Sequence, residues 1–312
     1  MEGRRYRIES GGVSLFARAW GDPDATPLVL VHGYPDNHGL WEPVAEQLAG
    51  RFHVIAYDVR CAGASDKPRR VSAYRMDKLA DDLRAVTEAL IPGRDFHLAG
   101  HDWGSIQSWE SVTTEPLKSR ILSFTSISGP CLDHVGFWMR RRLGSLSWRE
   151  QRKALRQLVS SWYIMLFQLP VLPPLAWQLG VGRLWPVMLE KVEGIADATA
   201  AEDAETRTTD GRYGVNLYRA NFMQKLLSPK ERHAAAPVQL IVPLRDNYAS
   251  PALFEELHQW VPQLYRVDID AGHWVIMSDP ADIAARIGGF VDAVEARNLE
   301  ERFSDARVGH TA

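Results

Sequence analysis

The sequence predicts an α/β fold in which a mostly parallel sheet carries helices on both faces and is interrupted by an inserted helical segment. Short apolar runs at 27–31 (PLVLV), 52–57 (FHVIAY) and 96–99 (FHLA) are typical of buried strands. Each run ends at turn residues, and helical patterns separate the runs, which is the order of a parallel sheet. This alternation stops after residue 130 and resumes only near residue 237.

The remaining elements follow in chain order. An outer strand is predicted by alternating apolar residues at Val13, Leu15, Ala17 and Ala19. The other expected elements are helices over 39–48 and 76–90, strands over 121–128 and 237–243, a helix over 251–260, a strand over 265–269 and a helix over 280–294.

The interruption divides the chain into a core and an insertion. Residues 131–234 show no strand pattern and are rich in tryptophan and in helical stretches broken by proline. We therefore expect an α/β core at 1–130 and 235–296 and a helical cap, or lid, at 131–234. The last residues, 297–312, are expected to form a polar, frayed tail.

Composition excludes several classes of protein. The 312 residues are 46% hydrophobic and 24% charged, as in an ordinary globular protein. The net charge of −3 lacks the basic excess of a nucleic-acid-binding surface. The two cysteines, Cys61 and Cys131, are too few for a disulfide scaffold and lack metal spacing. Since no signal peptide is recognisable either, we expect a cytoplasmic location.

One uncharged segment has the length of a membrane span. Residues 157–182 carry no charge and would be long enough to cross a bilayer as a helix. Pro170, Pro173 and Pro174 lie within five positions, and prolines at this density end a helix. A buried or pocket-lining segment is therefore favoured, with a membrane span as the alternative.

A nucleophile is predicted at the turn that follows the run at 96–99. In Gly100-His101-Asp102-Trp103-Gly104, small residues stand two positions before and two after Asp102. This spacing permits the tight strand-to-helix turn called a nucleophile elbow, which usually holds serine. Amide groups at the start of the following helix would keep the carboxylate ionised. The alternative is that Asp102 only caps that helix.

Two further strand ends carry the partners that such a nucleophile needs. Asp246 follows the strand at 237–243, and His273 follows the strand at 265–269. Ligands of parallel sheets bind beyond the carboxyl ends of the strands. The order nucleophile, acid, histidine is that of the α/β hydrolases. We therefore predict His273 as the general base and Asp246 as the residue that orients it.

At this point the chain resembles the α/β-hydrolase superfamily and, within it, the epoxide hydrolase branch. The turn at 32–35 (HGYP) is similar to the family's HGxP turn, which implies a cis bond before Pro35 and an oxyanion hole made by the backbone N–H groups of Tyr34 and Trp103. The stretch at 57–68 resembles the family's DxRGxGxSDKP motif. It departs from that motif at Cys61, where the family has glycine.

The cap carries the residues that distinguish the branches of this family. Epoxide hydrolases place one tyrosine before F-Q-x-P and one in N-x-Y-R, and these motifs match Tyr163 and Tyr218. By this resemblance the two phenols are the acids that protonate the opening epoxide, whereas a halide needs only N–H donors. The alternative is that both are aromatic core residues. Haloalkane dehalogenases commonly have asparagine in place of Tyr34, and fluoroacetate dehalogenases have arginine in place of Trp103.

The predicted function is that of an epoxide hydrolase acting through a covalent ester on Asp102. Alternatives are a haloalkane- or fluoroacetate-type dehalogenase and a binding module of this fold without catalysis. No metal or other cofactor is expected, since no G-x-G-x-x-G or P-loop motif is present. The apolar cap segment at 158–179 predicts a lipophilic epoxide as substrate and peripheral contact of the cap with a membrane. Arg140, Arg141 and Arg142 are expected to face lipid head groups or a fatty carboxylate.

Overall fold

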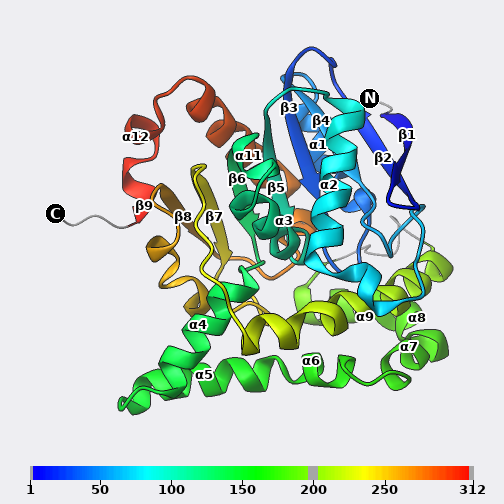
Figure 1. Ribbon diagram of the computed structural model, residues 1–312, viewed down its shortest axis with the longest axis vertical. Coiled ribbons are helices and arrows are strands. Elements are labelled where there is room, and N and C mark those ends of the chain that lie inside the picture. Colours follow the sequence, from blue (N-terminus) through cyan, green and yellow to red (C-terminus); the bar gives the residue numbers. More distant parts are fainter. Residues whose placement is uncertain (1–2, 196–202, 309–312) are drawn as a thin grey trace.

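A nine-stranded sheet organises the computed structural model, which describes residues 3–195 and 203–308 (Figure 1). The strand order is β1-β2-β4-β3-β5-β6-β7-β8-β9. The central strands are parallel, and β1, β2 and β9 pair antiparallel at the edges. The strands are β1 (Arg4–Ser10), β2 (Val13–Trp20), β3 (Thr26–Val31), β4 (Phe52–Tyr57), β5 (Phe96–His101), β6 (Ile121–Ile127), β7 (Val238–Pro243), β8 (Leu264–Ile269) and β9 (Arg307–Val308).

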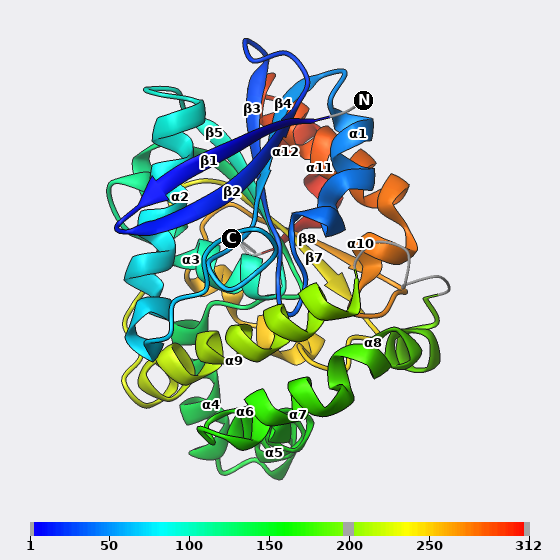
Figure 2. The same cartoon turned by 90° about the vertical axis from the view of Figure 1, so that its right-hand side faces the viewer.

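Helices cover both faces of the sheet because its central strands are apolar on both sides. Every residue of β4, β5 and β7 is buried. α1 (Glu42–Leu48) and α11 (Pro280–Glu295) pack together on one face, and α2 (Met76–Leu90) and α3 (Trp103–Thr113) pack on the other (Figure 2). Short helical elements of the core are η1 (His38–Trp41), η2 (Val71–Tyr74), η3 (Leu117–Ser119), η6 (Pro251–Phe254), η7 (Leu257–Gln259), α10 (Val275–Ser278), α12 (Leu299–Arg302) and η8 (Ser304–Ala306).

The predicted α/β fold is confirmed, but one predicted helix is wrong and one strand was missed. Residues 251–260 form the separate 3₁₀ turns η6 and η7 instead of one helix. Arginines of the cap hold Glu255 and Glu256 at this place, so contacts with a distant segment override the local helical pattern. The strand β1 was not predicted, because its sequence RRYRIES is mostly polar; it pairs with β2 along its whole length.

The prediction of a frayed tail is also wrong for its described part. Between residues 297 and 308 the chain forms α12, η8 and the strand β9, which pairs with β8. Leu299 is buried, and the ring of Phe303 lies 5.4 Å from that of Phe290. Apolar side chains spaced through a polar sequence are therefore enough to attach this segment to the sheet. Residues 309–312 of the predicted tail lie outside the described residues.

The insertion between β6 and β7 is helical throughout its described residues. α5, α6 and α7 form the outermost layer of the molecule, and α9 lies between this layer and the core (Figure 1). Residues 196–202 of the predicted cap lie outside the described residues. The elements are α4 (Leu132–Leu143), α5 (Trp148–Ser160), α6 (Trp162–Phe167), α7 (Leu172–Ala176), the π-helical turn η4 (Trp177–Val181), α8 (Gly182–Met188), the π-helical turn η5 (Leu189–Glu193) and α9 (Ala204–Leu227).

The long helix α9 joins the cap to the core. Asp203 begins it by accepting hydrogen bonds from the amides of Glu205 and Thr206. A Cβ atom at Gly214 would lie 2.4 Å from the ring of Tyr34, so only glycine lets α9 approach this core turn. Within the described ranges, 3–195 and 203–308, no helix combines the length and apolar character needed to cross a membrane.

Candidate active site

Asp102 occupies a strained turn between β5 and α3. Its φ of 51° and ψ of −122° lie outside the helical and extended regions that ordinary residues prefer. A Cβ atom at Gly104 would lie 2.0 Å from the carbonyl oxygen of Val31, so the turn requires glycine there. The carboxylate is held at the carboxyl edge of the sheet by this geometry, and α3 begins directly after it.

One backbone amide points at this carboxylate from the neighbouring turn. The N–H of Tyr34 donates a hydrogen bond of 2.7 Å to Oδ1 of Asp102. A Cβ atom at Gly33 would lie 2.4 Å from the same oxygen, so this turn can approach only because residue 33 is glycine. The Tyr34–Pro35 bond is cis, as the resemblance implied. The amide of Trp103 is the first of α3, where helix geometry provides no intrahelical acceptor.

His273 and Asp246 follow β8 and β7 and meet Asp102 at the same edge. Nδ1 of His273 lies 2.9 Å from Oδ2 of Asp246, and its Nε2 lies 3.6 Å from Oδ2 of Asp102. Oδ1 of Asp246 accepts hydrogen bonds from the amides of Tyr248 and Ala249, at 2.7 and 2.9 Å. The structure thus brings together all three residues predicted from separate strand ends.

Burial and charge act in opposite directions on His273. Its burial disfavours the charged imidazolium, but the carboxylates of Asp246 and Asp102 outweigh this effect and raise the pKa of His273 well above its usual value. Burial opposes the ionisation of Asp246 as well, yet His273 and two backbone amides lower its pKa. The two carboxylates therefore favour the charged form of His273.

Tyr163 and Tyr218 reach the same place from the cap. Tyr163 lies on α6 and Tyr218 on α9, and their ring centroids are 6.1 Å apart. Burial, aided by the charge of Asp102, raises the pKa of each phenol well above its usual value. Both hydroxyls are therefore protonated at neutral pH and able to donate a hydrogen bond.

A mostly apolar cavity of about 120 Å³ joins these residues. Asp102, His273, Tyr163 and Tyr218 all contribute to its wall. Its volume is below the range of about 300–1,000 Å³ that is typical for sites of drug-sized ligands. In the described part of the chain, no group of three or more histidine, cysteine or acidic residues could hold a metal ion. The apolar lining comprises Ile106, Leu132, Val135, Met139, Leu158, Ile164, Met165, Phe222, Met223, Leu226 and Leu253.

Comparison with known proteins identifies the family. A sequence model of the alpha/beta hydrolase fold matches residues 26–280. The chain belongs to the α/β-hydrolase family. It is 35% identical over 304 residues to "Probable oxidoreductase EphD" of Mycobacterium tuberculosis, covering 96% of this chain and 51% of that protein. It is 25% identical over 297 residues to "Epoxide hydrolase 3" of Xenopus tropicalis, covering 91% and 76%. The chain spans about half the length of the mycobacterial relatives it matches.

Solved structures support the same assignment of the fold. Epoxide hydrolase A from Mycobacterium thermoresistibile superimposes with a TM-score of 0.75 at 22% identity, covering 93% of this chain and 98% of that one. An epoxide hydrolase from Vigna radiata gives a TM-score of 0.75 at 20% identity, covering 93% and 98%. The resemblance to epoxide hydrolases seen in the sequence is thus confirmed at the level of family and fold.

Three polar contacts of this α/β-hydrolase site were not predicted. His101 lies with its Nε2 2.9 Å from the carbonyl oxygen of His273, and Glu193 accepts a hydrogen bond of 2.8 Å from the backbone N–H of His273. Asp36 accepts a hydrogen bond of 3.0 Å from the indole of Trp274, and burial raises its pKa to about 7. His101 and Asp36 adjoin predicted site residues, which was a usable signal. Glu193 comes from the cap, and no local pattern marks it.

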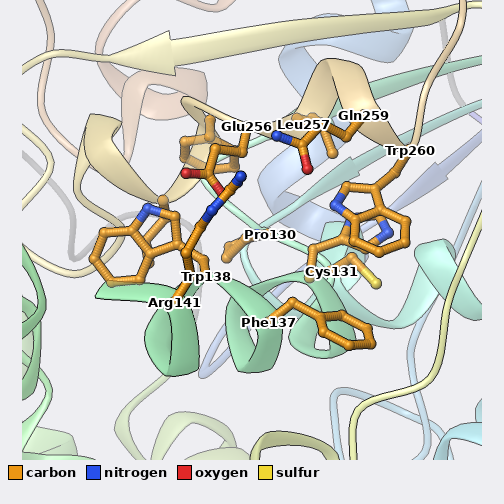
Figure 3. Close-up of a pocket in the computed structure, with 12 residues that line it drawn as sticks. Pro130, Cys131, Phe137, Trp138, Arg141, Glu256, Leu257, Gln259 and Trp260 are labelled. Atoms are coloured by element: carbon orange, nitrogen blue, oxygen red, sulfur yellow. The ribbon is translucent and has the colours of Figure 1, made fainter. Parts of the chain in front are cut away.

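A second cavity of about 230 Å³ lies beside the active site, where α4 meets η6 and η7 (Figure 3). Arg141 points across it toward Glu256, and the two form an ion pair of 3.0 Å. Arg142 pairs with Glu150, Glu255 and Glu256, while Arg140 donates to the carbonyl of Leu227. The expectation that these three arginines face lipid or a fatty carboxylate is therefore wrong, because acidic residues and a carbonyl of the protein itself engage them.

Proposed function

We propose that this α/β-hydrolase converts epoxides to vicinal diols through an ester on Asp102. Since Oδ1 of Asp102 is engaged by the Tyr34 amide, Oδ2 is the oxygen that attacks the epoxide carbon. The C–O bond of the ring breaks as the ester bond forms. The leaving oxygen remains tethered to the substrate and takes a proton from Tyr163 or Tyr218, while the other phenol donates a hydrogen bond.

The second half-reaction hydrolyses the ester. His273 takes a proton from water through Nε2, and the resulting hydroxide attacks the ester carbonyl carbon of Asp102. Negative charge develops on Oδ1, where the Tyr34 and Trp103 amides stabilise it by roughly 3 kcal/mol per donor. The bond between the carbonyl carbon and the ester oxygen then breaks. The departing diol oxygen takes the hydroxyl proton of the tetrahedral intermediate, which leaves Asp102 as a carboxylate, and the proton held by His273 restores the tyrosine. No metal, nucleotide or flavin takes part in this scheme.

The observation that carries the proposal is the pair of cap tyrosines, Tyr218 buried and Tyr163 half-buried, that share a cavity with an aspartate nucleophile and its histidine. A tethered alkoxide requires a proton donor, and two phenols of raised pKa at this place supply one. The relative and the solved structures that are named epoxide hydrolases support the same chemistry. The mycobacterial relative is named a probable oxidoreductase, but this chain matches only 51% of its length.

We propose further that the substrate is lipophilic and that the cap, residues 131–234, acts as the lid of the 1–130 and 235–296 core. The cavity wall is apolar, and each buried methylene contributes about 0.8 kcal/mol, so specificity should rise several-fold per carbon until the cavity is full. Because the cavity is small, a long chain must extend beyond it or displace the cap. A cytoplasmic location with peripheral membrane contact through the cap is part of the proposal.

Two experiments test this function. A single turnover in heavy-oxygen water should place the label in the Asp102 carboxylate, because water attacks the ester carbonyl; label confined to the first diol would contradict the ester. A panel of epoxides graded from short to C12–C18 chains, assayed for diol, tests the substrate class. Higher kcat/KM for epichlorohydrin than for the long chains would refute a lipophilic substrate and leave epoxide hydrolysis intact.

A dehalogenase is the second candidate, and one observation favours it. The indole Nε1 of Trp103 is buried beside the phenol of Tyr218, and both residues line the cavity. An N–H group of this kind could stabilise a leaving halide, which needs no proton. Release of chloride from a haloalkane without diol formation from any epoxide would establish this candidate. Failure of Asp102 to become alkylated by any reactive epoxide or haloalkane would instead indicate a non-catalytic binding module.

A further inference from the structure

Large apolar side chains are exposed almost only on the cap. Of the 18 such exposed side chains in the described residues, every one except Leu244 lies between Leu143 and Leu227. α5, α6 and α7 lie in a row along the outermost edge of the molecule in Figure 1, and the same helices form its lower edge in Figure 2. We call this surface the outer cap face; its exposed apolar residues are Trp148, Leu155, Leu158, Val159, Trp162, Met165, Leu169, Val171, Leu172, Leu175 and Leu179.

The charge of the outer cap face is of one sign. From residue 151 to residue 189 the sequence contains four cationic residues and no acidic residue. The exposed positions of α5 recur at the spacing of one helix face. Arg149, Arg152 and Arg156 lie on this face, among Trp148, Leu155 and Val159. No ion pair to these three arginines is found among the described residues. By contrast, Glu150 and Lys153 lie on the inner side of α5 and form ion pairs there.

This combination of arginine and apolar side chains fits an anionic lipid surface better than a second copy of this chain. Arginine beside tryptophan and leucine on one helix face is typical of helices that lie in the plane of a bilayer interface. A second copy of this chain, docked through the same face, would bring unneutralised arginines together without an acidic residue to compensate them. Anionic lipid head groups would neutralise the arginines and accept the apolar side chains at once.

The active-site cavity opens toward the outer cap face. Leu158 and Met165 line the cavity, and 47% and 60% of their surfaces remain exposed. Both lie among the exposed residues of α5 and α6. A substrate partitioned into a bilayer under this face would therefore meet the cavity without crossing water. This step rests on the epoxide hydrolysis of the proposed function, whereas binding of the face to lipid does not rest on that chemistry.

We propose that the outer cap face binds the surface of an anionic bilayer and delivers lipophilic epoxides from it to the active site. Flotation of the full chain with phosphatidylcholine vesicles containing phosphatidylglycerol tests the first half. We expect binding to these vesicles, weak binding to pure phosphatidylcholine, and a loss of binding as salt rises, since salt screens exposed charges.

Charge-reversal variants test whether the outer cap face is the surface that binds the vesicles. The triple variant Arg149→Glu, Arg152→Glu and Arg156→Glu should weaken binding by at least about 100-fold, since each arginine near an anionic surface contributes on the order of fivefold. The matched control replaces Arg69, Arg70 and Arg302, which are exposed and lie outside the cap, with glutamate. This variant should bind the vesicles with an affinity close to that of the unmodified protein. An equal loss in both triple variants would refute a specific face and indicate unspecific attraction.

Apolar variants provide a second, independent measurement. Val159→Ser with Leu179→Ser should weaken binding about tenfold at high salt, where the apolar contribution dominates. Turnover of a short, water-soluble epoxide by all variants reports whether they are folded. Self-association without vesicle binding would overturn the proposal in favour of a second copy. Vesicle binding without any epoxide turnover would refute the proposed function but not the lipid-binding face.

Discussion

The two halves of the active site are held in place by different forces. At the edge of the sheet, hydrogen bonds position the side chains: Asp246 binds His273 and two amides, and Asp102 accepts from the Tyr34 amide. In the cap, rings position them: Tyr218 lies 4.9 Å from Trp103 and 5.5 Å from Phe222, measured between centroids. The sheet edge supplies groups fixed in charge and direction, whereas the cap supplies phenols whose hydroxyls are available to a substrate.

This difference suggests that the two halves serve different steps. Charged groups need fixed partners, because an uncompensated buried charge is costly. A phenol that donates a proton must follow the substrate oxygen as it moves. Packed aromatic rings restrict this movement less than fixed hydrogen bonds would. Changes at the sheet edge should therefore stop one half-reaction, whereas changes in the cap should slow the reaction by degrees.

The largest effect is expected for His273→Gln. Alkylation of Asp102 should continue, since the carboxylate attacks without the base, but ester hydrolysis should slow by about 10²–10⁴-fold. Intact mass spectrometry should show accumulation of protein heavier by one substrate molecule. The matched control is His258→Gln, at an exposed position of η7. Normal turnover by the His273 variant would contradict its role as base.

A smaller effect is expected for the cap tyrosines. Tyr163→Phe and Tyr218→Phe should each lower the rate of alkylation by about 10- to 100-fold, because one donor to the leaving oxygen remains, and the double variant should lose more than either. The rate of ester hydrolysis should hardly change. Rapid-quench measurement of both steps distinguishes these outcomes, with Tyr213→Phe on α9 as the control. Equal loss in both half-reactions would indicate a structural role.

The pH dependence should differ between the half-reactions. In the free protein, Asp246 and Asp102 together raise the pKa of His273 despite its burial. Esterification removes the charge of Asp102, so the pKa of His273 must fall in the intermediate. Ester hydrolysis requires neutral His273 and should therefore rise with pH, with an apparent pKa below that of the free protein. Ester decay from about pH 5 to pH 9, set against an NMR titration of His273, measures both values; equal values would contradict this coupling.

The smallest effect concerns the contact between the cap and the base. Glu193→Ala removes the acceptor of the His273 backbone N–H and should slow ester hydrolysis by about tenfold, the equivalent of one hydrogen bond to a charged group. Glu193→Gln retains an acceptor oxygen and should restore most of the rate. Glu190→Ala, an exposed neighbour on η5, is the control. An unchanged rate in the Ala variant would show that the cap does not position His273.

The site residues of the core could be predicted because local sequence specifies them. A buried strand that ends at a small-x-Asp-x-small turn determines both the backbone path and the exposed side chain, and the structure gives Asp102 this position. Asp246 and His273 follow from the same rule, since the ends of neighbouring parallel strands meet at one edge. The cap tyrosines depended on family resemblance, because their helices show only an aromatic pattern that a packed core would share.

What the sequence by itself determined is the order of strands and helices and the chemistry at the strand ends, because both arise from contacts within a few residues. Only the tertiary structure decided the pairing of the arginines at 140–142, the division of residues 251–260 into two turns and the attachment of β9 to β8. Apart from Glu150, which also pairs with Arg142, the partners in these contacts lie roughly 40 to more than 110 positions apart. Free energies of such contacts depend on which surfaces meet after folding, and no local pattern contains that information.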